Sequence, residues 1–179
     1  MSFLLKFALG MDWLSDRIGK LASWAVLISA VICAGTAFVR YGLDMGSNAW
    51  LEVQWYLFAA IVMLGAPYVL EKNEHVRVDL IYGKLKGNGP VYVDLFGLLL
   101  FLLPVIGLLA WLSWPYFYRV WTMNEMSSNA GGLIRWPVVI LMPVGFALLW
   151  LQGWAEVIKR VAYLQGKFAM DTHYEKPIQ

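Results

Sequence analysis

The sequence predicts an all-α membrane protein with four transmembrane helices. Of its 179 residues, 60% are hydrophobic, and a mean hydropathy of +0.61 is too high for a soluble domain of this length. Four stretches contain no Asp, Glu, Lys, Arg or His, and each is long enough for a helix to cross a bilayer: residues 21–39, 53–70, 95–118 and 136–155. A β-barrel is excluded because runs such as residues 98–103 do not alternate apolar and polar positions. We therefore expect one integral membrane domain over residues 1–179.

The segment before the first span has the pattern of an amphipathic helix. Its apolar residues recur at steps of three and four: Phe3, Leu4, Phe7, Ala8, Met11, Leu14 and Ile18. The pattern is typical of a helix lying in the membrane interface, so we predict an N-terminal interfacial helix ahead of the span. The apolar run at 21–39 is longer than the core of a secretory signal, and no Ala-x-Ala site closes it. We expect it to remain in the mature protein.

Two further segments lie outside the spans. Between spans two and three, Val76, Leu80, Ile81 and Leu85 fit one face of a short helix on the cytoplasmic side, and Gly and Pro at 87–90 then interrupt it. After span four, residues 167–179 carry mixed charges and a proline, which predicts a mobile tail.

Basic residues are distributed unevenly among the segments that connect the spans. Eleven of the fourteen Lys and Arg lie before span one, between spans two and three, or after span four. The other two connections hold only Arg40, Arg119 and Arg135. The positive-inside rule then places both termini in the cytoplasm and the loops at about 40–52 and 119–135 outside.

The sequence has no pattern that indicates catalysis, a cofactor or a metal. Cys33 is the single cysteine, and His75 and His173 are too few and too far apart for a metal or haem site. No nucleophile with a base, phosphate loop or pair of acids at a defined spacing is found. We expect no enzyme activity, no cofactor and no nucleic-acid partner.

The aromatic and polar residues of the spans have ordinary membrane explanations. Tryptophans gather at the span ends, as in the aromatic belts that contact membrane lipids at the interface. Thr36, Gln54 and Gln152 are expected to form interhelical hydrogen bonds rather than a solute path.

Several motifs, in order along the chain, carry a family resemblance. They are the segments 48–60, 64–66, the His-Val-Arg-Val-Asp run at 75–79, Ser-Trp-Pro at 113–115, 129–137, 143–146 and 151–160. Over residues 48 to about 160 the chain resembles the small, DctQ-like membrane subunit of tripartite ATP-independent periplasmic (TRAP) transporters. It is most similar to the branch labelled for mannitol or chloroaromatic compounds.

The resemblance implies a function that composition does not give. In this family a soluble periplasmic protein captures a solute, often an organic acid, and a large elevator-type permease subunit moves it across the bacterial inner membrane with sodium. The small subunit is similar to a non-catalytic scaffold that braces the large one. The residues that select the solute would then lie on the other chains.

Two sets of contact residues follow from the resemblance and the predicted topology. The candidate contacts with the large subunit are Trp55, Arg77, Asp79, Trp114, Trp136 and Gln152. The candidate docking residues for the binding protein, on the outward side, are Trp50, Glu52, Glu125 and Arg135.

Two alternatives make different demands on the sequence. An autonomous four-helix transporter acting as a homo-oligomer would require an essential acidic residue inside a span, and the four spans contain none. A quinone-linked thiol oxidase would require several cysteines, and the chain has one.

Overall fold

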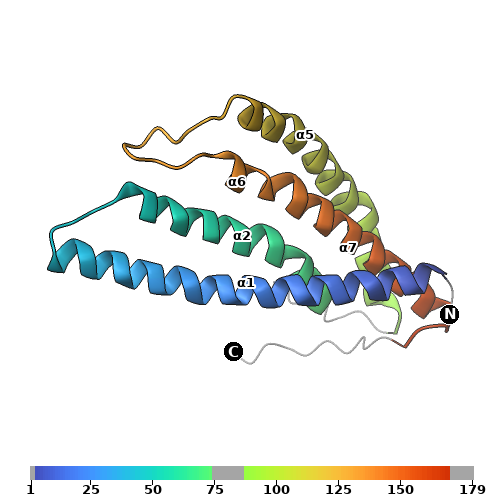
Figure 1. The fold of residues 1–179 in the computed structure, drawn as a ribbon. Helices are drawn as coiled ribbons and strands as arrows, with labels where there is room; N and C mark the ends of the chain where they lie inside the picture. The colour runs from blue at the N-terminus through green and yellow to red at the C-terminus, as the bar shows by residue number, and fades with distance from the viewer. Residues whose placement is uncertain (1–2, 74–86, 170–179) are drawn as a thin grey trace.

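The computed structural model describes residues 3–73 and 87–169, and these residues are almost entirely helical (Figure 1). The elements are α1 (Phe3–Gly42), α2 (Asn48–Lys72), α4 (Gly89–Gly97), a π-helical turn η1 (Leu98–Leu102), α5 (Leu103–Thr122), α6 (Trp136–Val139) and α7 (Leu141–Leu164). Four helical segments are long and apolar enough to cross a membrane: α1, α2, the continuous stretch Gly89–Thr122, and Trp136–Leu164. The prediction of an all-helical protein with four candidate spans is confirmed.

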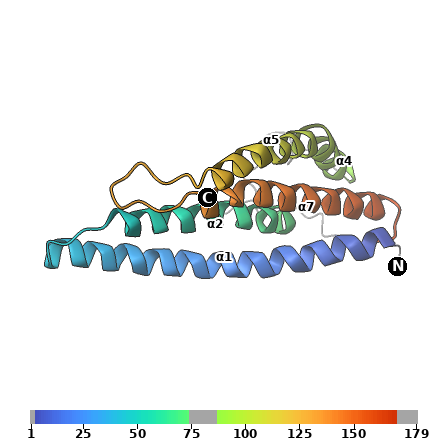
Figure 2. The ribbon, with the colours of Figure 1, turned by 45° about the horizontal axis from the view of Figure 1, so that its top comes forward.

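The N-terminal segment forms no separate helix. It continues without a break into the first span, and the resulting α1 has 40 residues, or about 60 Å at 1.5 Å per residue. Figure 2 shows α1 running the length of the molecule. Ala8 and Met11, on the apolar face predicted for the membrane interface, are buried against Ala155 of α7. Phe3 and Leu4 of the same predicted face are exposed, and the separate interfacial helix is not confirmed. A helical period of apolar residues is also found where a helix packs on protein, so the period did not identify the surface that the helix contacts.

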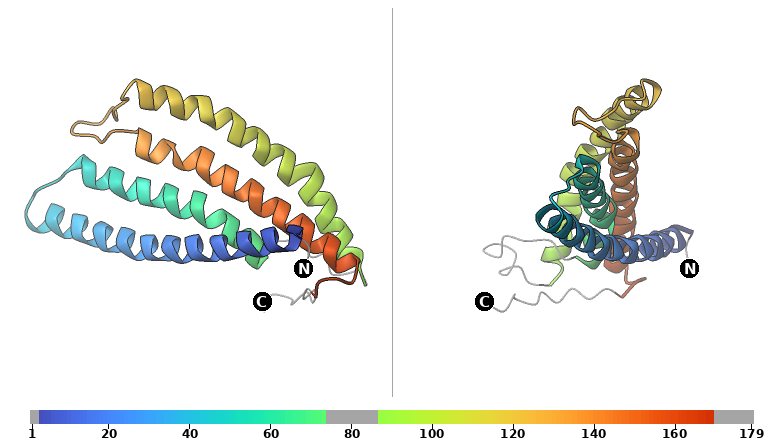
Figure 3. Two further views of the ribbon diagram at one scale, coloured as in Figure 1. Left: turned by 45° about the vertical axis from the view of Figure 1, so that its right-hand side comes forward. Right: turned by 60° about the vertical axis from the view of Figure 1, so that its left-hand side comes forward.

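The helices lie side by side in the order α1, α2, α7 and α5, as a layer rather than a closed ring (Figures 1 and 3). Extensive packing joins α1 to α2, α2 to α7, and α7 to α5, and α1 also packs on α7. Among the described helices, α1 and α5 share no extensive packing. Because α7 lies between neighbours, it is the most buried of the four, whereas α1 and α5 form the edges.

Glycines allow close approach at the helix seams. A Cβ at Gly145 of α7 would lie 2.7 Å from the carbonyl oxygen of Met63 in α2, and a Cβ at Gly19 would lie 2.4 Å from the Tyr68 ring. Small residues at such crossings let helix backbones pack tightly, which is a main source of attraction between helices in a membrane.

The layer has two ends, the loop end and the terminus end. The loop end carries residues 43–47, between α1 and α2, and residues 123–135, between α5 and α6; the terminus end carries the start of α1 and the end of α7. The predicted short helix at 76–85, with Arg77 and Asp79, falls outside the described residues, as does the predicted tail from residue 170 onward. That the whole chain forms one domain remains a prediction.

Candidate functional site

A buried carboxylate organises the loop end. Glu52 lies in the first turns of α2 and is only 3% exposed. Its Oε1 accepts hydrogen bonds from the Ser127 hydroxyl and from Asn129 Nδ2 at 2.8 Å, and its Oε2 accepts the Leu133 backbone N–H at 2.6 Å. We call Glu52, Ser127, Asn129 and Leu133 the loop clamp. Three donors from one loop satisfy this carboxylate without a cation, which is the condition for burying it.

Neighbouring turns of α2 extend the loop clamp. Asn48, Glu52 and Tyr56 are four residues apart, so they share one face of the helix. Asn48 Nδ2 donates to the Ala130 carbonyl at 3.0 Å, and the Tyr56 hydroxyl donates to the Ile134 carbonyl at 2.9 Å. The loop at 127–134 is therefore fixed along one face of α2.

The loop itself depends on two glycines. Gly131 has φ +69°, a conformation that side chains with a Cβ rarely adopt. A Cβ at Gly132 would lie 2.6 Å from the Ser127 side chain. The Gly-Gly pair thus allows the sharp reversal that brings Ser127 and Leu133 to the same carboxylate.

An ion pair closes the base of the loop. The carboxylate of Glu125 pairs with the guanidinium of Arg135, and the Arg135 N–H donates to the Glu125 carbonyl at 2.9 Å. A second guanidinium nitrogen of Arg135 lies 3.3 Å from the Tyr116 hydroxyl. Both charged side chains are partly exposed, so they remain accessible to another protein.

The structure separates the four candidate docking residues into two kinds. Trp50 is 56% exposed, and Glu125 and Arg135 are also accessible. Glu52 is buried, with both oxygens occupied by the loop clamp. We therefore reassign Glu52 from direct contact to positioning of the loop. The sequence placed it correctly at the start of α2, but its partners are more than 70 residues away along the chain.

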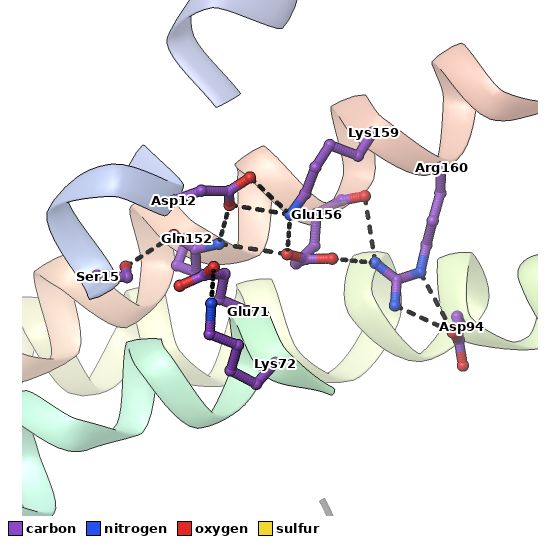
Figure 4. Close-up of polar contacts among 9 residues, drawn as sticks. All are labelled: Asp12, Ser15, Glu71, Lys72, Asp94, Gln152, Glu156, Lys159 and Arg160. Atoms are coloured by element: carbon purple, nitrogen blue, oxygen red, sulfur yellow. Dashed lines mark hydrogen bonds and ion pairs between the residues drawn. The ribbon is translucent and has the colours of Figure 1, made fainter. Parts of the chain in front are cut away.

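A second buried cluster lies at the terminus end (Figure 4). We call it the ionic network; its members are Asp12 of α1, Asp94 of α4, and Gln152, Glu156, Lys159 and Arg160 of α7. Lys159 Nζ lies 2.9 Å from Asp12 and 2.6 Å from Glu156. Arg160 pairs with Glu156 and, at 3.0 Å, with Asp94. Each cation therefore contacts two carboxylates, and the network links α1, α4 and α7.

Gln152 is the polar centre of the ionic network. It is 0% exposed. Its Nε2 donates to Asp12 at 2.8 Å and to Glu156 at 3.2 Å, while its Oε1 accepts the Ser15 hydroxyl at 2.9 Å. The expectation that Gln152 forms interhelical hydrogen bonds is confirmed. Because it has no exposed surface, we no longer place it among direct contacts with another subunit.

The ionic network was not predicted from the sequence, because residues 3–20 were expected at the membrane surface and residues 156–160 in a cytoplasmic segment. One signal was available. Gln152, Glu156, Lys159 and Arg160 recur at the helical period, which aligns them on one face that continues past the apolar run. Their partners Asp12 and Asp94 follow only from the arrangement of the helices.

Nearby, one carboxylate is less completely satisfied. Glu71 Oε1 pairs with Lys72 at 2.8 Å, whereas Oε2 is buried without a hydrogen-bond partner. Over residues 3–73 and 87–169, no group of three or more His, Cys, Asp or Glu side chains could hold a metal ion.

The remaining candidate contacts with a second subunit differ in exposure. Trp55 of α2 is 67% exposed and Trp114 of α5 is 57% exposed. Trp136, at the start of α6, packs against Phe117, Val120 and Val139 inside the chain. Trp55 and Trp114 thus have the surface that such a contact needs.

A family model matches most of the sequence. The family described as tripartite ATP-independent periplasmic transporters, DctQ component, matches residues 28–162, about three quarters of the chain. The chain belongs to this family. The resemblance in the sequence motifs is thereby confirmed at the level of the family, although the match does not distinguish its branches. No curated protein and no solved structure was found to match the chain.

Membership in the DctQ family makes the chain a component of a membrane transporter. The DctQ family is a family of transporter components and is not a known enzyme family. The four membrane-length helices agree with a role in the membrane. The matched region begins within α1 and includes the loop clamp and the α7 part of the ionic network.

Proposed function

We propose that this chain is the non-catalytic scaffold subunit of a sodium-coupled TRAP transporter of the bacterial inner membrane. It braces a large elevator-type permease, which receives a small organic acid or related solute from a periplasmic binding protein. Within the family we place it nearest the branch labelled for mannitol or chloroaromatic compounds. Both termini lie in the cytoplasm, so the loop end faces the periplasm.

One observation carries the scaffold proposal. Between the loop clamp and the ionic network, the apolar cores of the four spans contain no Asp, Glu, Lys, Arg or His, and the charged residues of both clusters are already engaged within the chain. Coupling an ion gradient requires a group that binds or releases an ion inside the membrane. The charges of this chain hold helices and a loop in place instead.

The shape of the layer supports bracing. A closed four-helix bundle buries the inner face of each helix, whereas a layer leaves two broad faces and two edges uncovered (Figures 1 and 3). Many large hydrophobic side chains of the four helices are exposed. Trp111 and Trp114 of α5 and Trp55 of α2 are among the large exposed side chains. We assign Trp55 and Trp114 to the contact with the large subunit, since aromatic anchors contribute strongly to protein interfaces.

The loop end supports a role in docking the binding protein. The loop clamp holds residues 127–133 in one shape, which lowers the entropy that binding would cost. Trp50 supplies an exposed aromatic ring, and Glu125 with Arg135 supplies charges of both signs. We assign these three residues to the docking surface.

Reconstitution tests the proposal. Proteoliposomes with this chain alone, with the large subunit alone, and with both are supplied with binding protein loaded with its radiolabelled solute. We expect sodium-dependent uptake only when both membrane subunits are present. Uptake by this chain alone would overturn the scaffold role in favour of an autonomous transporter. Full uptake by the large subunit alone would show that bracing is not needed.

A further inference from the structure

The loop end contains a groove that lies outside the loop clamp and shares only Trp50 with the docking surface. It lies between the last turns of α1 and the start of α2 and has a volume of about 380 Å³. Ile32, Gly35 and Val39 of α1 line it together with Trp50 of α2. The volume is within the range of small-ligand sites. Its walls suit an alkyl chain.

A polar hollow adjoins the groove. It has a volume of about 360 Å³, and its lining includes Arg40, Asp44 and Asn48. Thr36, Met45, Gly46 and Ser47 line both spaces, so the apolar groove and the polar hollow adjoin. An elongated ligand with an apolar chain and a polar head would occupy both.

The two charges of the hollow are opposite in sign and are not engaged with each other. Neither Arg40 nor Asp44 forms an ion pair within 4.0 Å in the described part of the chain, and both are exposed. This distinguishes them from Glu125 and Arg135, which pair directly across the base of the loop. A ligand that carries an anion and a cation a short distance apart would match both side chains.

We propose that the groove and the hollow together bind one phospholipid with a phosphate and a primary ammonium in its headgroup, such as phosphatidylethanolamine. One acyl chain lies along Ile32, Gly35 and Val39, the phosphate pairs with Arg40, and the ammonium pairs with Asp44. Trp50 lies at the junction, where tryptophan rings prefer the level of the headgroups. The site is independent of which solute is transported.

Charge complementarity favours this occupant over the alternatives. An apolar helix of a partner subunit would fill the groove but leave Arg40 and Asp44 unmatched. A lipid with an anionic headgroup and no amine would match Arg40 and place its charge beside Asp44. Only a zwitterionic headgroup satisfies both side chains. Bound there, the lipid bridges the end of α1 and the start of α2, just beyond the contact in which Gln54 Nε2 lies 3.5 Å from Thr36 Oγ1.

Native mass spectrometry of the delipidated full-length chain tests the site. Phosphatidylethanolamine and phosphatidylglycerol with identical acyl chains are titrated separately. We expect phosphatidylethanolamine to bind about fivefold more tightly, the typical effect of one matched charge near a membrane surface. Asp44→Asn should remove that preference, and Arg40→Ala should weaken both lipids about fivefold. Arg119→Ala, which removes an exposed arginine outside the lining of both spaces, should change neither.

A second pair of variants tests the groove. Gly35 lines the groove and a Cβ there has open space around it, so Gly35→Phe should extend a ring into the groove without a clash at its Cβ. It should abolish binding of both lipids. Gly10→Phe, also open and on the same helix, is the matched control and should leave binding unchanged. In parallel, phosphatidylethanolamine with brominated acyl chains should quench the tryptophan fluorescence of the wild type more than that of Trp50→Phe, because the bromine atoms would lie near the Trp50 ring.

The outcomes that overturn the proposal are distinct. Equal affinities of the wild type, Arg40→Ala and Asp44→Asn would show that the headgroup is not recognised. Unchanged lipid binding in Gly35→Phe, or quenching that Trp50→Phe does not reduce, would place the lipid elsewhere on the surface.

Discussion

The loop clamp and the ionic network both bury carboxylates, but they satisfy them by different means. Glu52 accepts hydrogen bonds from three neutral donors, all from residues 127–133. Glu156 is paired with two cations of its own helix, and these also hold Asp12 of α1 and Asp94 of α4. The first arrangement fixes one loop on one helix, whereas the second joins three helices. Loss of the first should therefore have a local effect and loss of the second a global one.

The two ends of the layer should also differ in the side of the membrane that they face. After replacement of the exposed Cys33 by alanine, Ser128→Cys at the loop end should react with a membrane-impermeant maleimide added to intact cells, and Asn88→Cys at the terminus end should not. Both side chains are exposed and outside the two clusters, so the contrast is expected to be nearly complete. Labelling of Asn88→Cys in sealed cells would contradict the topology.

The largest effect on stability is expected in the ionic network. Glu156→Ala leaves Lys159 and Arg160 buried with fewer counter-charges, and removing one partner of a buried pair typically costs about 3–5 kcal/mol. The unfolding midpoint of the chain in detergent should fall markedly. Glu125→Ala is the matched control, because it removes a carboxylate from a partly exposed pair worth about 0–1 kcal/mol. Equal effects would remove the distinction between the two ends.

The contact between α2 and α7 connects the two ends, and adding a methyl group at Gly145 tests how tightly these helices must pack. A Cβ at Gly145 would lie 2.7 Å from the Met63 carbonyl oxygen, so Gly145→Ala should separate the helices at a cost of about 1–3 kcal/mol. Gly97→Ala adds the same methyl group where nothing lies within 4 Å and should be tolerated. Thermal unfolding of both variants in one detergent measures the difference, and a stable Gly145→Ala protein would show that the seam is compliant.

The loop clamp should fail locally. Glu52→Gln replaces one carboxylate oxygen by an NH2 group, which donates hydrogen bonds and cannot accept them. The side chain keeps its shape, but at least one donor of the loop loses its acceptor. Hydrogen-exchange protection of the Leu133 amide should fall about tenfold, with little change in the global unfolding midpoint. Gln165→Glu, the reverse exchange at an exposed position at the end of α7 and outside the loop clamp, serves as the control. Global destabilisation by Glu52→Gln would contradict the local role.

The smallest effect is expected at the docking surface. Charge reversal by Glu125→Arg or Arg135→Glu should reduce uptake about twofold to fivefold when binding protein is limiting, because exposed charges mainly affect encounter. Excess binding protein should restore uptake, and the double exchange should restore the ion pair. If excess binding protein fails to restore uptake, docking is the wrong explanation for these residues.

The sequence predicted the four spans because the signal for a span is local. A run of apolar residues long enough for the bilayer is read from one segment without knowledge of the others. All four predicted stretches lie inside the observed helices, which extend beyond them at both ends in most cases. The ordered motifs likewise indicated the family, since residues 28–162 match it.

The sequence indicated which polar residues are important in the spans and at their ends, but not which residues they contact. Gln152 was expected to form hydrogen bonds between helices, yet nothing along the chain indicated that Asp12 would accept from it and Ser15 would donate to it. Glu52 was predicted as a docking residue on the outward side, and the structure buries it under a loop 75 to 81 residues further along the chain. The face of residues 3–20 was identified as apolar, but it packs on α7 in addition to any lipid that it meets.

The sequence by itself determined which segments are helical, how many can span a membrane, and the family. Only the tertiary structure decided that the helices form a layer with α7 inside, that a carboxylate fixes the outer loop, and that charges from α1, α4 and α7 neutralise one another. The physical reason is range. Helix formation and membrane insertion depend on residues a few positions apart, whereas a buried charge is stable only beside partners that the packing of distant segments brings to it.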